Sequence, residues 1–155
     1  MSDVSDWKAR LSELGVDLPP VAAPVAAYVP AVRTGNLVYT SGQLPFEGGA
    51  LPVVGKVGDA VDADTAKAAA RTCALNALAA IDALVGLDSI VRIVKVVGFV
   101  ASADGFTGQP GVINGASEFL GEVFGEAGVH ARSAVGVAEL PLAAPVEVEL
   151  IVEVG

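Results

Sequence analysis

Residues 146–154, at the end of the chain, read Val-Glu-Val-Glu-Leu-Ile-Val-Glu-Val, a pattern that largely alternates apolar and acidic side chains. A two-residue period is typical of a β-strand with one buried face, so the three glutamates are expected on the other face. A second strand-like run, residues 130–137, carries Arg132 with no carboxylate beside it. The turn-rich connection 140–145 predicts an antiparallel hairpin that brings this basic residue and an acidic one into one neighbourhood.

Three upstream segments are expected to supply the rest of the core. Asp62 is a good N-cap for an alanine-rich helix that continues to Gly86. Residues 89–101 are rich in β-branched side chains and apolar on both faces, which predicts a central strand. After the glycine-rich loop 105–111, a second helix is expected from about Val112 to Ala127.

Shorter elements complete the predicted order. Residues 31–33 and 37–42 are expected to form two paired strands. Residues 1–24 are expected to be accessory, with a short amphipathic helix within 2–15 and an extended, proline-rich lead-in over 16–30. The order β-β-α-β-α-β-β favours an α+β fold, with a mixed sheet covered by two main helices on one face and free to pack on a partner with the other.

Composition favours a single domain over residues 1–155, because 53% hydrophobic residues are ample for one core. The formal net charge of −9 disfavours binding to nucleic acid, whose affinity depends on neutralising phosphates. Mean hydropathy is +0.61, yet charged or polar residues interrupt each apolar run before about twenty residues, so no membrane span is predicted. Only 17% of residues are charged, and the apolar surface that this implies predicts self-association.

Cys73 is the only cysteine, which excludes an intramolecular disulfide, and the chain does not open with a basic and apolar leader. A cytoplasmic location is therefore expected. With one cysteine and one histidine, His130, no metal cluster of those residue types is expected.

From the residues alone, Arg132 has two interpretations. It is either a structural arginine paired with a carboxylate across the hairpin, or a bidentate clamp for the carboxylate of a ligand. The spacing of Glu147 does not distinguish it from Glu149 or Glu153, so by default all three are solvated strand glutamates. Tyr28 would ordinarily be a packing residue that is half-buried.

Several motifs nevertheless occur together in a recognisable order: Tyr28, then Arg-Thr-Gly-Asn-Leu-Val-Tyr-Thr-Ser-Gly-Gln-Leu-Pro over 33–45, then the helix from Asp62, then Ala-Arg-Ser at 131–133 and finally Leu-Pro and Val-Glu-Val up to Val148. This pattern resembles the Rid family, the reactive intermediate deaminases, also known as YjgF-like proteins or L-PSP endoribonucleases. The resemblance covers roughly residues 25–154.

The resemblance implies a chorismate-mutase-like fold and a homotrimer with a cleft between neighbouring subunits. It implies a deaminase that hydrolyses reactive 2-imino or enamine acids to 2-keto acids and ammonia, with no cofactor, metal or nucleic-acid partner. In that cleft, Arg132 would hold the substrate carboxylate and Glu147 would position or activate water. Tyr28, the main-chain groups of Ser41 and Gly42, and Asn114 would line the pocket.

Two other functions stay open. One is a non-catalytic or chaperone-like protein that binds small carboxylates and keeps only the arginine clamp. The other is the endoribonuclease or translation inhibitor of the older family name, which conflicts with the net charge. This sequence also departs from the family pattern, with His130 where Pro or Ala is common and Ala134 where many members have Cys. The loop 105–111 and the N-terminal extension leave the identity of the substrate open.

Overall fold

The computed structural model describes residues 6–21 and 27–155 of the chain, and its centre is a five-stranded mixed sheet in the order β1-β2-β5-β3-β4. The strands are β1 (Ala31–Thr34), β2 (Leu37–Thr40), β3 (Ile90–Ala101), β4 (Ala131–Val137) and β5 (Val146–Val154). All neighbours pair antiparallel except β3 and β4, which are parallel. The predicted α+β fold and the order of its main elements are confirmed.

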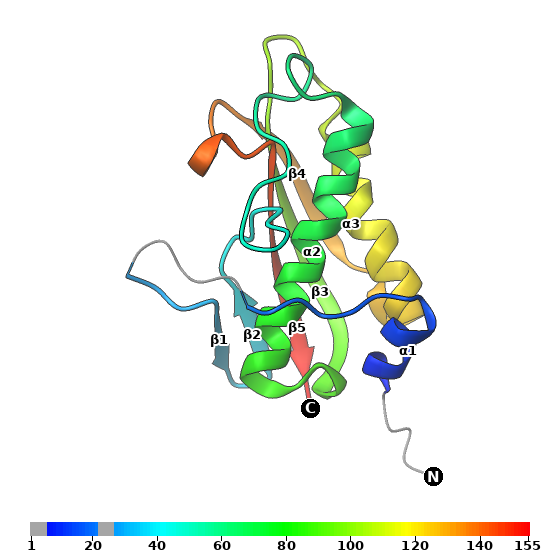
Figure 1. Cartoon of the computed structure of the whole chain (residues 1–155). Helices are drawn as coiled ribbons and strands as arrows, with labels where there is room; N and C mark the ends of the chain where they lie inside the picture. Colours follow the sequence, from blue (N-terminus) through cyan, green and yellow to red (C-terminus); the bar gives the residue numbers. More distant parts are fainter. Residues whose placement is uncertain (1–5, 22–26) are drawn as a thin grey trace.

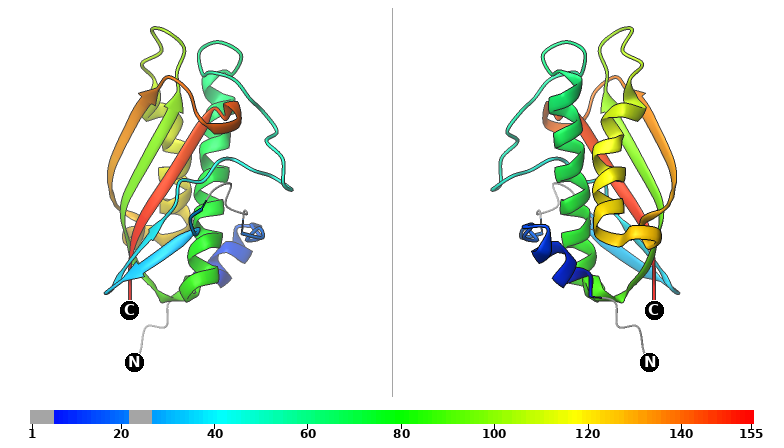
Figure 2. Two further views of the ribbon diagram at one scale, coloured as in Figure 1. Left: turned by 90° about the vertical axis from the view of Figure 1, so that its left-hand side faces the viewer. Right: turned by 90° about the vertical axis from the view of Figure 1, so that its right-hand side faces the viewer.

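Two long helices, α2 (Ala63–Val85) and α3 (Gln109–Phe124), pack side by side on one face of this sheet (Figure 1). The side views in Figure 2 show helices and sheet as two layers. Short 3-10 turns follow α2 (η1, Leu87–Ser89), follow α3 (η2, Gly125–Gly128) and lie between β4 and β5 (η3, Pro141–Ala143). The other face of the sheet is not covered by any helix of the described residues.

Helix α2 forms where its capping residues predict. The Asp62 carboxylate accepts a hydrogen bond of 2.7 Å from the Thr65 amide, and this bond lowers the pKa of Asp62. Gly86 ends the helix with a positive φ of 84°. The length and hydropathy of α2 would suit a membrane span, but more than half of its most apolar window is buried inside the domain. It is a core helix, and Cys73 within it is fully buried, which raises the pKa of the thiol.

Helix α3 lies three residues earlier than predicted, since it begins at Gln109 and ends at Phe124. The glycine-rich loop is correspondingly shorter, because Pro110 is tolerated in the first turn, where its missing N–H has no helical acceptor. Gly125 has a φ of 59°, a conformation that ends the α-helix, and the chain continues as η2 rather than as helix to Ala127.

Strand β5 has the predicted alternation. Its five buried positions face the helices, and they are Val146, Val148, Leu150, Val152 and Val154. Glu147, Glu149 and Glu153 point to the uncovered face, which we call the open face. Apolar side chains on the same face of the other strands are partly exposed, including Val32, Tyr39 and Val135. The open face is therefore the surface on which the predicted partner would pack.

The predicted hairpin between the last two strands is wrong. Strand β3 lies between β4 and β5 and pairs with both of them. Because β3 is largely apolar on both faces, it is best buried with a neighbour on each side, whereas β4 lies at the sheet edge. Sequence proximity favoured the hairpin, but the crossover through α3 places β4 parallel to β3.

At the N-terminus, α1 (Trp7–Glu13) lies within the segment 2–15 where a short helix was predicted, and residues 2–5 of that segment lie outside the described residues. The Trp7 indole donates to the Ile90 carbonyl at 2.8 Å and packs edge-on against Phe124, with 4.9 Å between ring centroids. These contacts attach α1 to the domain. The lead-in has no helix or strand over 16–21 and 27–30, and the rest of it lies outside the described residues.

Candidate functional site

Arg132 lies on the helix-facing side of the sheet. In the sheet it is level with the buried residues Val96 and Leu150, so its side chain points toward α3. Its Nη1 atom donates to Asn114 Oδ1 at 2.8 Å and to Ser117 Oγ at 3.2 Å, and Nη2 approaches the Pro110 carbonyl at 3.4 Å. The structure therefore brings two of the predicted site residues, Arg132 and Asn114, into direct contact.

The charge of this guanidinium is not matched by a protein anion. Arg132 takes part in none of the four ion pairs formed within residues 6–21 and 27–155. Every acceptor that it contacts there is neutral, and its Nε atom has no acceptor among those residues. Asn114 lies beyond the first turn of α3, which begins at Gln109, and from there its amide oxygen reaches Arg132 on β4.

Glu147 projects from the open face and packs against Gly42. A Cβ atom at position 42 would lie only 2.8 Å from the carboxyl carbon of Glu147, so a side chain there would displace the carboxylate from its present position. A pair of main-chain hydrogen bonds between Gln43 and Val148 holds the two segments together. Burial, and then the charge of Glu149, raises the pKa of the Glu147 carboxyl.

The same segment approaches Tyr28. The Ser41 hydroxyl donates to the Val29 carbonyl at 2.6 Å, and the Ser41 amide donates to the Pro30 carbonyl at 2.8 Å. These bonds hold the end of the lead-in beside Gly42, and Tyr28 in it is 45% exposed. Tyr28 is thus about half-buried, which agrees with its ordinary interpretation as a packing residue.

The predicted residues therefore form two groups. One group, the Arg132 group, contains Arg132 and Asn114 on the helix-facing side near the β4 edge. The other, the Glu147 group, contains Ser41, Gly42 and Glu147, and Tyr28 precedes Val29, whose carbonyl accepts from Ser41. Strand β3 separates the groups, and the two key side chains point to opposite faces of the sheet. Within one chain they do not share a neighbourhood, contrary to the hairpin prediction.

Two further polar side chains, Ser117 and His130, extend the Arg132 group, and neither was predicted as a site residue. Ser117 Oγ lies 2.8 Å from His130 Nε2, and His130 Nδ1 lies 2.6 Å from the Gly128 carbonyl oxygen. The spacing of Asn114 and Ser117 by three residues on a predicted helix was the available signal for Ser117. The sequence does not indicate which helix faces Arg132, so this spacing alone could not connect Ser117 with Arg132.

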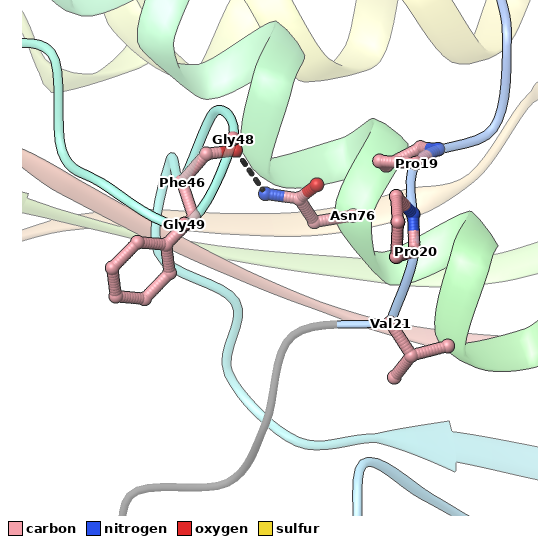
Figure 3. A pocket seen from close by; sticks show the side chains of 7 residues that line it. All are labelled: Pro19, Pro20, Val21, Phe46, Gly48, Gly49 and Asn76. Carbon is pink, nitrogen blue, oxygen red and sulfur yellow. Dashed lines mark hydrogen bonds between the residues drawn. The ribbon is translucent and has the colours of Figure 1, made fainter.

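A pocket of about 350 Å³ lies elsewhere, between the lead-in, the loop after Leu44 and α2 (Figure 3). It is lined by Pro19, Pro20, Val21, Phe46, Gly48, Gly49 and Asn76. Asn76 is buried there, and its amide nitrogen donates to the Leu44 and Phe46 carbonyls at 3.0 and 3.1 Å, so it holds the loop in place. None of the predicted site residues lines this pocket. Over residues 6–21 and 27–155, no three His, Cys, Asp or Glu side chains gather as metal ligands.

Comparison with known proteins identifies the family. A family model described as "YjgF/chorismate mutase-like, putative endoribonuclease" matches residues 8–154. The chain belongs to this family, the Rid family. Within it, Protein TCP17 of Trypanosoma cruzi is 45% identical over 147 residues, which cover 94% of this chain and 92% of that protein.

Solved structures of similar proteins share the fold. Atu1372 from Agrobacterium tumefaciens, a protein of unknown function, is 48% identical with a TM-score of 0.89, over 96% of this chain and 92% of that one. TdcF of E. coli, solved with bound serine, is 27% identical with a TM-score of 0.64, over 87% and 94% of the two chains. The chorismate-mutase-like fold that the sequence motifs implied for this Rid protein is confirmed.

Proposed function

We propose that this Rid protein hydrolyses reactive 2-imino and enamine acids to 2-keto acids and ammonia, without a cofactor. The observation that carries the proposal is Arg132, a partly buried arginine that no carboxylate neutralises within the described residues. A guanidinium in such a place is well suited to an anionic ligand, and a carboxylate matches its fork of N–H donors.

The geometry leaves one edge of the guanidinium for that ligand. Nη1 is occupied by Asn114 and Ser117, and Nη2 has only the 3.4 Å contact with Pro110. The Nε and Nη2 atoms together form an edge with two parallel N–H donors, which is the arrangement that binds a carboxylate in a bidentate manner. The substrate would therefore be held by its carboxylate, with the imine carbon beyond it.

Glu147 would supply proton transfer. As water adds to the imine carbon, a C–O bond forms, the carboxylate takes a proton from the water and a proton passes to the imine nitrogen. In the second step the hydroxyl proton passes to the amino nitrogen by way of the carboxylate, the C–N bond breaks, and ammonia leaves as the keto group forms. A carboxyl whose pKa is raised by burial suits both roles.

A complete site requires two copies of the chain. The Arg132 and Glu147 groups lie on opposite faces of one sheet, so a site that contains both is formed when the β4 edge of one copy meets the open face of its neighbour. We propose that the copies form a cyclic homotrimer with three such clefts. The serine bound to TdcF supports a ligand of this class, since serine carries a carboxylate beside a nitrogen-bearing carbon.

The test is imine hydrolysis by variants at position 132. With 2-iminobutanoate generated by a threonine dehydratase, Arg132→Ala should reduce kcat/KM about 100-fold or more, because roughly 3 kcal/mol of charge-assisted hydrogen bonding is lost. Arg132→Lys should also lose most activity, since it keeps the charge but not the fork. Arg10→Ala, at an exposed position of α1, is the control. A folded Arg132→Ala variant with the wild-type rate would make Arg132 structural and refute the proposal.

The main alternative is a protein that binds small carboxylates and hydrolyses nothing. Glu147 argues against it, since a carboxylate beside an anionic ligand weakens binding and is useful only for proton transfer. Glu147→Gln separates the two functions: an enzyme loses turnover, whereas a pure binder binds 2-oxobutanoate as well or more tightly and shows no hydrolysis in either form. Glu149→Gln, two residues along the same strand face, is the control.

The endoribonuclease in the family description is the third candidate. The net charge of −9 repels phosphate, and the chain has one histidine, so a histidine pair for acid-base cleavage of RNA is lacking. We expect no RNA binding at physiological salt; saturable cleavage of RNA by nuclease-free protein would contradict this. A cytoplasmic location, which suits a buried and unpaired Cys73, remains part of the proposal.

A further inference from the structure

A hydrogen-bond network runs from Arg132 through Ser117 and His130 to the main chain. Arg132 Nη1 donates to Ser117 Oγ at 3.2 Å, Ser117 Oγ lies 2.8 Å from His130 Nε2, and His130 Nδ1 lies 2.6 Å from the Gly128 carbonyl oxygen. All three side chains are partly buried. The network thus connects α3, the turn η2 and the start of β4.

The chemistry of the last bond determines the protons in the others. A carbonyl oxygen only accepts, so His130 Nδ1 carries a proton and donates to Gly128. In the neutral imidazole Nε2 is then bare, and the Ser117 hydroxyl must donate to it. Because its proton is donated to His130, the Ser117 hydroxyl offers only lone pairs to Arg132. The guanidinium only donates hydrogen bonds, so it needs such an acceptor. Each bond in the network therefore supports the orientation of the next.

The helix supplies a matched set of acceptors. Pro110, Asn114 and Ser117 follow at intervals of four and three residues, so they lie on one face of α3, and each provides one oxygen to Arg132. Asn114 and Ser117 both bind Nη1 and take up its two N–H groups. The plane of the guanidinium is consequently set by α3, while the Nε and Nη2 edge stays available.

We propose that Ser117 and His130 are positioning residues that fix the plane of the Arg132 guanidinium for a planar 2-keto or 2-imino monocarboxylate. The proposal rests on the proposed function, because it assumes that Arg132 binds the ligand carboxylate. Without the hydroxyl of Ser117, Nη1 keeps one acceptor in place of two, and the plane of the guanidinium is held only by Asn114 and by the longer contact of Nη2 with Pro110. Binding of a small anion then weakens, although the charge is unchanged.

The first test is the tautomer of His130. Because the chain has a single histidine, imidazole nitrogen signals in NMR spectra of labelled protein belong to His130. We expect the neutral ring to carry its proton on Nδ1, with a bare Nε2, which is the less favoured tautomer of free histidine. A neutral ring protonated on Nε2 would overturn the proposal, since Ser117 could not then donate to it.

The second test compares two isosteric variants at position 117. Calorimetry should show that Ser117→Val binds 2-oxobutanoate about 5- to 20-fold more weakly than wild type. Ser117→Thr keeps the hydroxyl and should bind nearly as well as wild type. His130→Phe should weaken binding like Ser117→Val, and the double variant should be no worse than either, because both act through one path. In the imine assay the change should appear in KM and leave kcat nearly unchanged.

Arg132→Ala distinguishes the carboxylate clamp from the positioning role of Ser117 and His130. If it abolishes binding while Ser117→Val, Ser117→Thr and wild type bind equally, the clamp stands and the positioning role is wrong. If Arg132→Ala binds 2-oxobutanoate as tightly as wild type, or wild type does not bind it, the clamp itself is wrong and the proposed function fails with it. A thermal unfolding curve for each variant confirms that binding is compared between folded proteins.

Discussion

The carboxyl group of Glu147 is partly buried against Gly42. Its ionisation is therefore expected to destabilise the folded protein. Its folded-state pKa is raised, so the cost is present above that pKa and disappears as pH falls below the unfolded value of about 4.3. Solvent screens this partly exposed carboxylate, so the expected effect is small: Glu147→Gln should raise the free energy of unfolding at pH 7 by about 0.5–1 kcal/mol and change it little at pH 4. Chemical denaturation at the two pH values measures this.

Glu126→Gln, at an exposed position in η2, is the control and should leave the stability within about 0.5 kcal/mol at both pH values. A Glu147→Gln variant less stable than wild type at pH 7 would mean that the carboxylate is held by favourable contacts. In that case Glu147 would be a structural residue of the Gly42 contact.

Glu149 raises the pKa of Glu147 through the repulsion between the two carboxylates, in addition to the larger effect of burial. If Glu147 acts as a base, activity falls as pH drops through its pKa, so the acid limb of the kcat/KM profile should lie above the ordinary glutamate value. Glu149→Gln should move that limb to lower pH and leave the plateau rate nearly unchanged. An acid limb that does not move would show that another group controls it.

Helix α3 is placed against α2 by a glycine contact, and this gives a test within one element. A Cβ at Gly115 would overlap the main-chain carbonyl oxygen of Lys67 in α2, whereas a Cβ at Gly121 would meet no atom within 4 Å. Gly115→Ala should destabilise the fold by about 1–3 kcal/mol through overpacking. Gly121→Ala should stabilise it by about 0.5–1 kcal/mol, because alanine favours a helix.

Equal effects of the two substitutions on the thermal unfolding curve would contradict this packing. The two substitutions also test the Arg132 group, because α3 carries Asn114 and Ser117, which accept hydrogen bonds from Arg132. If Gly115→Ala is tolerated through a shift of α3, these contacts should loosen and carboxylate binding should weaken. Gly121→Ala should leave binding at the wild-type level, since nothing has to move.

At the level of the assembly, the separation of the two groups predicts complementation between inactive chains. The solution mass should be three times the 15.5 kDa of one chain. Arg132→Ala and Glu147→Gln chains should each be inactive, but trimers assembled from equal amounts should regain about a quarter of the wild-type activity, because one ordered neighbour pair in four is intact. The imine assay on co-refolded chains measures this.

The matched control mixes Arg132→Ala with Asn114→Ala chains. Both lesions lie in the Arg132 group, so every site in the mixture keeps one lesion and the mixture should gain nothing over its parts. No recovery in the first mixture, or a monomeric mass at micromolar concentration, would refute the shared site and the trimer.

Much of the fold could be predicted because its signals are local. The cap at Asp62, the stop at Gly86 and the alternation of β5 each depend on residues within a few positions of one another. The first turn of α3 was missed because Pro110 and the neighbouring glycines resemble a loop in sequence. The family motifs added the site residues, and the structure brought Arg132 to Asn114 and Gly42 to Glu147 as two separate contacts.

The sequence by itself determined which segments are helices and strands and which face of β5 is buried, because side-chain periodicity and capping act over one or two turns. Only the tertiary structure decided that β3 separates β4 from β5, since an apolar strand does not specify its neighbours. The same packing decided that α3 faces Arg132, and thereby joined Ser117 and His130 to it. The residues in these contacts are 13 to 18 positions apart in the sequence. Their contacts depend on how α3 packs against β4, and a pattern within one element does not specify that packing.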